Sequence, residues 1–588
     1  MPYRSDRRTF VKSLAALGAV GYTGLWRNPA WAASANAAPS LQTLSGDTFD
    51  LFVEQRQVTL GGEARTALTI NGGLPGPLLR WREGSTVTLR VHNRLSEPTS
   101  LHWHGILLPA NMDGVPGLSF HGIAPGQTFE YRFLVRQHGT YWYHSHSGFQ
   151  EQTGVYGPLV IDPREPEPAP MREQVLMLTD WTDENPKRVF DRLKKEPGYY
   201  SQNARTLGTF IDDASQHGLG ATLRDRWMWA RMRMDPTDLA DVTGQAYTYL
   251  VNGRAPDDNF TSLFTPGEPL RLRFINGSAM TYFDVRIPGV KMTVVAADGQ
   301  PVQPVSVDEF RLAVAETLDV IVQPEGNAAY TVFAQAMDRS GYARATLASA
   351  PGLVASVPEL DAPVVVSMAD TGMGMGMGMG MGHDAMGGMP GMAHGEHSSM
   401  AGMKGMAGMA GMAPPVEHKA SEQGNPLVDM QTSAPTARLN DPGIGLRDNG
   451  RRVLTYADLR STFSDPDPRA PSRTLELHLT GHMDKFVWAF DGVKFADAEP
   501  IRLRYGERVR LVLVNDTMMA HPIHLHGMWS DLEDEHGQFM VRKHTIDVPP
   551  GTRRSYRVSA DALGRWAYHC HMLYHMEAGM FREVRVDE

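Results

Sequence analysis

Three segments of this 588-residue chain repeat one pattern, and internal repetition constrains the fold more than any other feature of the sequence. Each segment has an Asn-Gly or Asp-Gly pair, then a glycine, then an asparagine that closes a run of alternating residues. The glycine and the asparagine are nine positions apart in every copy. The three sets are Asn71-Gly72 with Gly84 and Asn93, Asn252-Gly253 with Gly267 and Asn276, and Asp491-Gly492 with Gly506 and Asn515.

The runs inside these repeats alternate in the manner of half-buried β-strands that begin and end at turns. Residues 85–91 and 508–514 are two examples, and the 58 glycines and 40 prolines supply turns throughout. A chain of this length is too long for one core and should form about three or four domains. We therefore expect an all-β protein with three related β-sandwich domains, at residues 45–165, 170–355 and 425–588.

A low-complexity segment separates the second and third domains. Residues 368–412 consist of Gly-Met and Gly-Met-Ala units with three histidines, His383, His394 and His397. This composition lacks the branched and aromatic residues that build a core, so we expect a flexible segment within residues 356–424. A second insertion, residues 224–234, could be a helix or a loop in the second domain.

The first residues are typical of an export signal. Arg7 and Arg8 precede an apolar run at residues 13–26 and a small-residue run at 30–35. Residues 1–37 resemble a twin-arginine signal, which predicts a periplasmic protein; the alternative is a basic start to the first domain. Cleavage could follow Ala32, Ala35 or Ala37. The apolar run is too short and too rich in Gly and Ala for a membrane span, so no stable membrane insertion is expected.

The net charge and the cysteine count exclude some functions. A charge of -10 and a pI near 6.1 argue against a nucleic-acid partner. The single cysteine, Cys570, cannot form a disulfide within the chain.

Four places in the sequence carry two histidines separated by one residue. Residues i and i+2 of a strand point to the same face, so each pair can present two imidazoles to one point. Imidazole suits copper and zinc among the first-row metals. Eight ligands are the number needed for one ion with two ligands and two ions with three. The four pairs are His102 and His104, His144 and His146, His524 and His526, and His569 and His571.

Cys570 stands between His569 and His571, so its sulfur should point to the opposite face of that strand. His521, His575 and Met580 are near it in the sequence. Two histidines, a thiolate and a weak thioether describe a blue copper electron-transfer site. An electron could pass from it through the backbone to the flanking histidines, over about 10 Å. A catalytic cysteine nucleophile is the alternative, but it would not explain the other histidines.

These motifs resemble the four copper-binding segments of the multicopper oxidases. The resemblance covers the first and third domains by motif and the second by its repeat only. The twin-arginine start and the methionine-rich segment resemble the bacterial periplasmic copper-resistance members of that family. The resemblance implies three cupredoxin-like Greek-key β-sandwich domains. It also implies four copper ions, namely one of type 1, one of type 2 and two of type 3.

The resemblance assigns a role to each ligand by position. The type 1 ion would be held by His521, Cys570, His575 and Met580, and the type 2 ion by His102 and His524. The type 3 ions would be held by His104, His144 and His571, and by His146, His526 and His569. Ligands from both ends of the chain imply that domains one and three touch. Domain two would be a spacer or a dock for the substrate.

The same resemblance suggests where protons come from. Asp113 matches an acidic residue that the family keeps near the three-copper cluster, so it is the candidate proton relay; the alternative is an Asp-Gly turn residue. Many relatives carry a glutamate directly after the third histidine of the last motif. Here that position is Met576, with Glu577 next, which leaves the second proton donor open.

The methionines suggest the electron donor. Thioethers prefer Cu(I), and the methionine-rich segment could bind extra Cu(I). It is accompanied by four methionines near the third copper motif: Met518, Met519, Met528 and Met540. We therefore expect an oxidase that oxidises Cu(I) to Cu(II), reduces dioxygen to water with four electrons, and confers copper tolerance.

Two other functions stay open. One is a laccase-like oxidase of diphenols or similar small organic donors, and the other is a copper-sequestering protein. The segment could also be a linker whose methionines are incidental. The sequence does not determine the oligomeric state. Eight more histidines are read as ordinary polar residues: His92, His121, His138, His217, His478, His482, His536 and His544.

Overall fold

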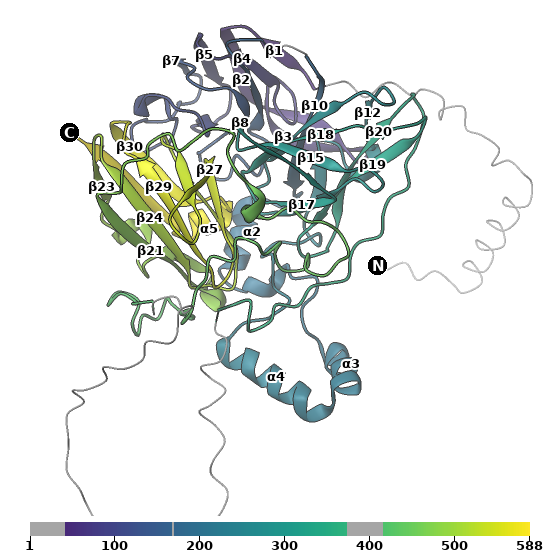
Figure 1. The fold of residues 1–588 in the computed structure, drawn as a ribbon, viewed down its shortest axis with the longest axis vertical. Helices are drawn as coiled ribbons and strands as arrows, with labels where there is room; N and C mark the ends of the chain where they lie inside the picture. Colours follow the sequence, from purple (N-terminus) through teal and green to yellow (C-terminus); the bar gives the residue numbers. More distant parts are fainter. Residues whose placement is uncertain (1–40, 167–169, 373–415) are drawn as a thin grey trace, which may run out of the picture. The chain divides into compact units, whose positions relative to one another are not determined.

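The computed structural model of the chain describes residues 41–166, 170–372 and 416–588. The chain forms three cupredoxin-like β-sandwiches in sequence order, coloured purple to blue, teal, and green to yellow in Figure 1. The predicted fold class is confirmed. The predicted export signal and the centre of the methionine-rich segment lie outside the described residues.

The first sandwich packs a sheet of order β3-β2-β5-β7 against one of order β1-β4-β9-β8-β6. The histidine pairs of this domain lie at the edge of the second sheet, on β6 and at the end of β8. The strands are β1 (Thr43–Ser45), β2 (Thr48–Leu60), β3 (Glu63–Ile70), β4 (Leu78–Arg82), β5 (Thr86–Asn93), β6 (His102–His104), β7 (Thr128–Leu134), β8 (Gly139–His144) and β9 (Tyr156–Asp162).

The second sandwich has sheets of order β11-β10-β13-β18-β15-β16 and β12-β20-β19-β14-β17. Its strands are β10 (Arg172–Trp181), β11 (Thr248–Val251), β12 (Phe260–Leu263), β13 (Leu270–Asn276), β14 (Phe283–Arg286), β15 (Met292–Ala297), β16 (Gln300–Val307), β17 (Glu309–Leu312), β18 (Thr317–Val322), β19 (Ala329–Ala336) and β20 (Tyr342–Ala348). Helices α2 (Pro186–Leu193), α3 (Leu207–His217) and α4 (Leu219–Met232) lie between β10 and β11.

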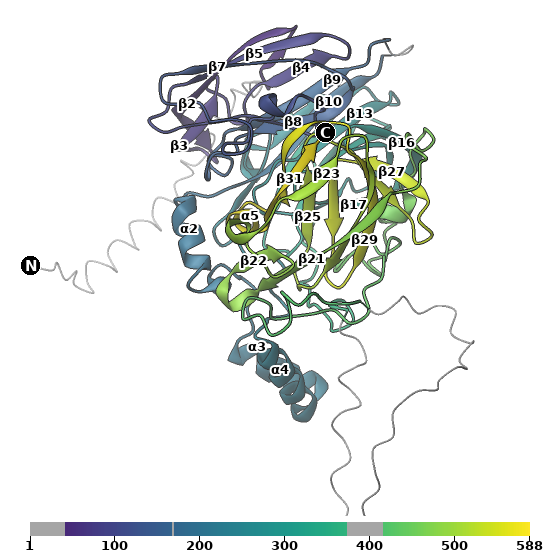
Figure 2. The same ribbon diagram turned by 90° about the vertical axis from the view of Figure 1, so that its left-hand side faces the viewer.

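The third sandwich has sheets of order β22-β21-β24-β29-β26-β27 and β23-β31-β30-β25-β28. Figure 2 shows several of these strands, among them β21, β25, β29 and β31, and the short helix α5. The elements are β21 (Arg473–His482), β22 (Val487–Phe490), β23 (Ile501–Arg504), β24 (Arg508–Asn515), β25 (His521–Leu525), β26 (Ser530–Glu533), β27 (Phe539–Lys543), β28 (Thr545–Val548), β29 (Arg553–Ser559), β30 (Gly564–Cys570), α5 (Leu573–Glu577) and β31 (Phe581–Asp587).

The Asn-Gly and Asp-Gly pairs of the repeat make the same turn in each sandwich. Both residues of each pair have positive φ, for example 53° at Asn71 and 75° at Gly72, which is the backbone of a tight hairpin turn. The side-chain oxygen of the first residue accepts a backbone hydrogen bond from a neighbouring strand. The donors are Phe52 to Asn71 at 2.7 Å, Met177 to Asn252 at 2.8 Å and His478 to Asp491 at 2.9 Å.

The closing asparagines also have one role. Asn93, Asn276 and Asn515 are buried at the ends of β5, β13 and β24. Each amide nitrogen donates to two backbone carbonyls, and each amide oxygen accepts from the N–H two residues later. A buried amide with all of these bonds made fixes the loop that follows the strand. In the third sandwich that loop leads directly to His521.

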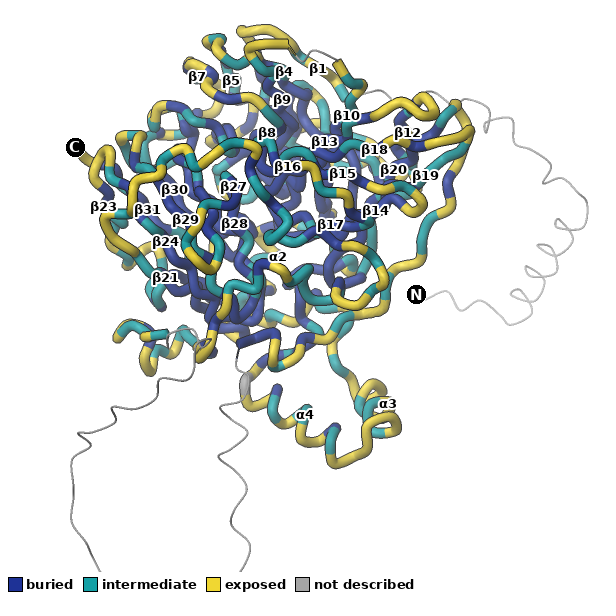
Figure 3. Tube along the Cα trace, in the orientation of Figure 1, coloured by how far each residue is buried: buried dark blue, intermediate teal, exposed yellow. Residues whose placement is uncertain are grey.

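The second insertion is helical. Helix α3 begins at a capping box formed by Thr206 and Thr209, and Gly218, with φ 84°, ends α3 and begins α4. The pair extends away from the sandwiches and is largely exposed, as Figure 3 shows, with Trp227 58 % exposed. Among the described residues, every helix is too short or too polar to cross a membrane.

The described flanks of the methionine-rich segment make defined contacts. Asp370 forms an ion pair with Arg447, and Thr371 and Glu422 are buried. The backbone N–H of Val366 donates to the carbonyl of Pro236 in the second domain. Residues 356–372 and 416–424, which the sequence assigns to the flexible segment, therefore pack against the sandwiches.

Candidate metal centre

Strand pairing brings the histidine pairs together within each domain. In the first sandwich β6 pairs with β8, which sets His102 opposite His144. In the third, β25 pairs with β30, which sets His524 opposite His569. Because alternate residues share a face, each pairing directs four imidazoles to one side of its sheet.

The two sets meet between domains one and three. Three groups of ring nitrogens have all members within 4.8 Å of one another: His102, His104 and His524; His104, His144 and His571; and His102, His146 and His526. Across the domains, His571 Nε2 lies 3.3 Å from His144 Nε2. His569 Nε2 lies 3.1 Å from His526 Nε2. All eight predicted cluster histidines therefore converge.

Cys570 makes a second, smaller group on the other side of β30. Its Sγ lies 3.6 Å from His521 Nδ1 and 3.8 Å from His575 Nδ1, and the two nitrogens are 3.1 Å apart. An ion bonded at about 2.0–2.1 Å to nitrogen and about 2.3 Å to sulfur needs ligand separations of about 3.4–3.8 Å. The three atoms are therefore spaced, to within a few tenths of an ångström, as ligands of one ion.

The buried Met580 is tied to this group through its backbone. Its carbonyl accepts from the N–H of Cys570 and its N–H donates to the carbonyl of His575, both at 3.1 Å.

Comparison with known proteins supports the same conclusion. The sequence pattern of the family described as multicopper oxidase matches residues 53–166, 221–351 and 468–588. The chain is 68 % identical to a Copper resistance protein A homolog of Pseudomonas syringae pv. tomato and 63 % identical to Copper resistance protein A of Escherichia coli, with 100 % of both chains covered in each case. The chain belongs to the multicopper oxidase family. The predicted resemblance is confirmed.

A solved structure of similar fold belongs to the same family. Fet3p, described as a multicopper oxidase that functions in iron import, has a TM-score of 0.62 and 18 % identity, over 92 % of this chain and 90 % of that one. At this identity the similarity concerns the fold alone.

Copper fits the donor atoms of this multicopper oxidase. Buried nitrogens of His102, His146 and His524 have no hydrogen-bond partner among the described residues. Burial lowers the pKa of most cluster histidines, to about 4 for His569, which leaves them neutral with a free lone pair. Burial also raises the pKa of the Cys570 thiol, so its thiolate needs a nearby cation.

Carboxylates hold several of these rings from outside. Asp113 Oδ2 lies 2.8 Å from His526 Nδ1, and the Asp113 carbonyl accepts from His102 Nδ1 at 2.9 Å. Glu151 Oε2 lies 2.7 Å from His144 Nδ1. Such partners fix the ring orientation and direct the opposite nitrogen at the metal. Asp113, the predicted proton relay, thus contacts two cluster histidines.

Three residues near the site escaped the sequence analysis. Asp241, on the loop before β11, accepts from His575 Nε2 at 2.8 Å, so the second domain supplies a group to the site despite lacking a copper motif. His544, read as an ordinary polar residue, has Nδ1 3.2 Å from His104 Nε2. Glu151 follows His146 by five residues, and this closeness in sequence was its only signal.

Other predicted residues lie elsewhere. Glu577, next to Met576 at the position where relatives carry a glutamate, is exposed, whereas seven of the eight cluster histidines are buried. The four methionines near the third motif are all buried, at most 3 % exposed: Met518, Met519, Met528 and Met540. Met518 lines a cavity between the second and third sandwiches.

Proposed function

We propose that this multicopper oxidase is a periplasmic cuprous oxidase that protects the cell from copper. Its relatives named Copper resistance protein A, matched over their whole length, support the role in tolerance. The twin-arginine pattern of residues 1–37 supports export. The observation that carries the proposal is the acidic loop beside His575, described below.

The ligand roles are those that the resemblance implies. His521, Cys570, His575 and Met580 would hold the type 1 ion, and His102 with His524 the type 2 ion. The type 3 ions would be held by the sets His104, His144 and His571, and His146, His526 and His569. Bound copper supplies one-electron transfer at the first site and four-electron reduction of dioxygen at the cluster. Cys570 links the two sites, because its peptide bonds lead directly to His569 and His571.

Asp241 favours a cationic donor. Its carboxylate holds His575 Nε2 at 2.8 Å, and Asp238 lies in the same buried loop. Burial and repulsion by Asp241 raise the pKa of Asp238 well above its ordinary value, so Asp238 retains its proton at neutral pH. Asp238 Oδ1 and Asp241 Oδ1 are both buried without a hydrogen-bond partner among the described residues. These free oxygens, next to a ligand of the proposed electron-accepting ion, could bind a cation such as Cu(I), whose charge would displace the Asp238 proton.

Asp113 and Glu151 are the candidates for proton supply. Both are buried and both contact cluster histidines. Burial raises the pKa of Glu151 well above its ordinary value, and its Oε1 has no partner among the described residues. Glu151 can therefore hold a proton beside His144, and Asp113, whose carboxylate contacts His526, would be the proton relay near the cluster.

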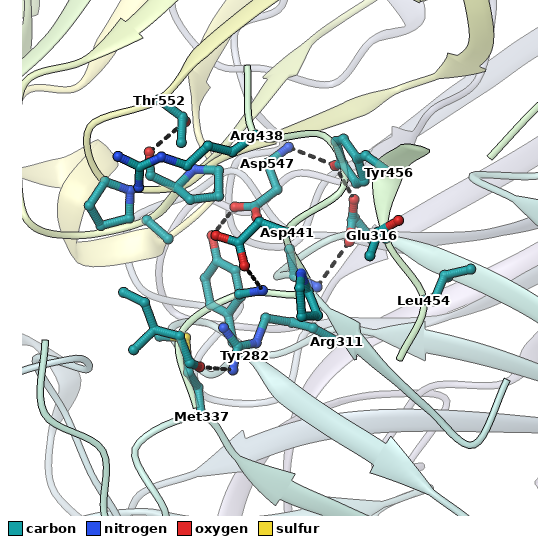
Figure 4. A pocket seen from close by; sticks show the side chains of 18 of the residues that line it. Tyr282, Arg311, Glu316, Met337, Arg438, Asp441, Leu454, Tyr456, Asp547 and Thr552 are labelled. Atoms are coloured by element: carbon teal, nitrogen blue, oxygen red, sulfur yellow. Dashed lines mark hydrogen bonds between the residues drawn. The ribbon is translucent and has the colours of Figure 1, made fainter. Parts of the chain in front are cut away.

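One cavity supports a second candidate function, oxidation of a small organic donor. Figure 4 shows it between the second and third sandwiches, with Tyr282, Met337, Asp441 and Tyr456 along its wall. Ala520, the residue before His521, also lines it. Its carboxylates already have partners, for example Asp547 with the Tyr282 hydroxyl at 2.8 Å. A cavity with aromatic walls and paired charges suits a phenol better than a metal cation.

Oxygen uptake with Cu(I) compared with a diphenol tests the proposal. We expect uptake with Cu(I) to be the faster, and deletion of residues 373–415 to lower it while diphenol oxidation is retained. Uptake with the diphenol alone would contradict the proposal and favour the laccase-like function. Copper tolerance that survives Cys570→Ser would instead favour sequestration.

A further inference from the structure

A second group of metal-ligating side chains lies apart from the ligands assigned above. His418 and Glu422 follow the methionine-rich segment, His478 is in β21, and Asp516 comes directly after β24. One ligand atom from each lies within 4.8 Å of the other three. His478, Glu422 and Asp516 are buried and His418 is half-buried.

Two of the four histidine–carboxylate separations in this group match the edge of a metal tetrahedron, and the other two are shorter. His478 Nδ1 lies 2.7 Å from Asp516 Oδ2 and 3.3 Å from Glu422 Oε2. His418 Nδ1 lies 3.1 Å from Glu422 Oε2 and 3.4 Å from Asp516 Oδ2. A tetrahedral ion with bonds of about 2.0–2.1 Å has edges of about 3.3–3.4 Å.

Hydrogen bonds around the group aim a lone pair inward. His418 Nε2 lies 3.1 Å from the carbonyl of Thr432, which can only accept, so Nε2 carries the proton. In the neutral ring Nδ1 is then an acceptor, yet it faces two carboxylate oxygens. Glu422 Oε1 is buried and has no partner among the described residues. The backbone N–H of Thr432 donates to the outer oxygen of Asp516 at 2.7 Å.

We propose that His418, Glu422, His478 and Asp516 bind a further metal ion, a divalent first-row cation. Two imidazoles and two carboxylates suit Cu(II) or Zn(II), whereas Cu(I) prefers thioethers. Without metal, Asp516 and Glu422 raise the pKa of His418 to about 9, and, against the effect of burial, Asp516 and Glu476 raise the pKa of His478 to about 10, so both rings hold a proton. A divalent ion would displace these two protons and balance the charge of the carboxylates in their place. The choice of Cu(II) as the bound ion rests on the proposed function, because oxidation of Cu(I) produces Cu(II). The existence of the site does not rest on that function.

The site lies between two parts of the proposed reaction path. It contacts the residues that flank the methionine-rich segment, and it is close to the chain that leads to His521, a proposed ligand of the type 1 ion. Thr432 Oγ1 donates to the carbonyl of Gly372 at 3.3 Å, so the described residues on both sides of the methionine-rich segment reach the site. Asp516 is followed by Thr517, whose hydroxyl lies 2.8 Å from His521 Nε2. A divalent ion here would lie close to the chain that leads into His521.

The opposing interpretation is an ion-pair network without metal, in which protonated His418 and His478 neutralise the two carboxylates. Crystals of the full-length, copper-replete protein, soaked separately with Cu(II) and Zn(II), distinguish the two. We expect an anomalous peak among the four side chains at the edge of the soaked metal. No peak with either metal would overturn the proposal.

A variant pair gives a second measurement. His418→Ala and Glu422→Gln should each bind one divalent ion fewer than the wild type, by elemental analysis after equilibrium dialysis. The exposed His536→Ala is the matched control and should keep the wild-type count. Equal counts in all four proteins would overturn the inference. Failure of the proposed function would appear separately, as absent oxygen uptake with Cu(I) in the wild type, and would leave these metal counts unchanged.

Discussion

Asp241 of the second domain lies 2.8 Å from Nε2 of His575 in the third. The domain without a copper motif thus contacts the site that we propose accepts electrons. A carboxylate in this position holds the ring and makes its metal-facing nitrogen more basic.

Asp241→Asn should therefore lower Cu(I) oxidation by about tenfold, the lower limit for loss of such a partner. Diphenol oxidation should fall less, because a neutral donor gains nothing from the negative charge. Oxygen uptake with both donors measures the difference. Asp212→Asn, at an exposed position on α3, is the control; equal losses with the two donors would argue against a cation-specific role.

Cys570→Ser should remove the blue absorption and the oxidase activity with every donor. Serine lacks the thiolate that defines a blue copper site. The eight cluster histidines are untouched, so the copper content should fall by one ion and not by four. A blue, active Cys570→Ser protein would disprove the ligand assignment, since the chain has no other cysteine.

Glu151→Gln should slow dioxygen reduction by about 100-fold, within the range expected for loss of a general acid. Burial raises the pKa of Glu151, so its acid form persists to higher pH than that of an ordinary glutamate and is lost as the pH rises past that value. The turnover rate of the wild type should therefore fall as the pH rises past the raised pKa of Glu151. The turnover rate of the variant should not show this fall. The pH profile of turnover is the measurement. Exposed Glu499→Gln should keep the wild-type profile.

Asp284→Asn should destabilise the second sandwich by about 3–5 kcal/mol, the usual effect of breaking a buried ion pair. Asp284 is buried with Arg339 at 2.5 Å and Arg311 at 2.8 Å. Burial opposes its ionisation, but the two arginines prevail and lower its pKa. The ion pairs of Asp284 therefore stabilise the fold fully at pH values above the ordinary aspartate pKa. This stabilisation is lost as the pH falls through the lowered pKa of Asp284.

Denaturant unfolding at neutral and at acid pH tests this prediction. The difference in the free energy of unfolding between the variant and the wild type should be smaller at acid pH. Asp191→Asn breaks an exposed pair with Lys187 and should cost about 0.3–0.5 kcal/mol. Similar effects of the two substitutions would contradict the prediction.

Local patterns were enough to predict the sandwiches and the shared direction of the two histidines in each pair. The turn at Asn71 and the strand ending at Asn93 follow from neighbours in the sequence, and i, i+2 spacing on a strand directs His102 and His104 to one face. The convergence of the two ends of the chain followed only from the family resemblance, because no local rule brings β6 to β25.

Residues on loops could not be predicted in this way. Asp241 reaches His575 through tertiary packing, and nothing in its own segment indicates that contact. Glu577, which the sequence left open as a second proton donor, shows that closeness in sequence does not ensure burial at the site. On a helix, residues two apart point in nearly opposite directions, so α5 buries His575 and exposes Glu577.

Thr432 has a consequence for how the methionine-rich stretch can evolve. Its hydroxyl meets Gly372 and its carbonyl meets His418, so the chain leaves and rejoins the third sandwich at a single residue. A stretch whose two anchors share one point can gain or lose repeat units without displacing either anchor, since closing a longer loop adds only about 0.6 kcal/mol per doubling. The number of Gly-Met units can therefore drift, or be selected, independently of the catalytic body.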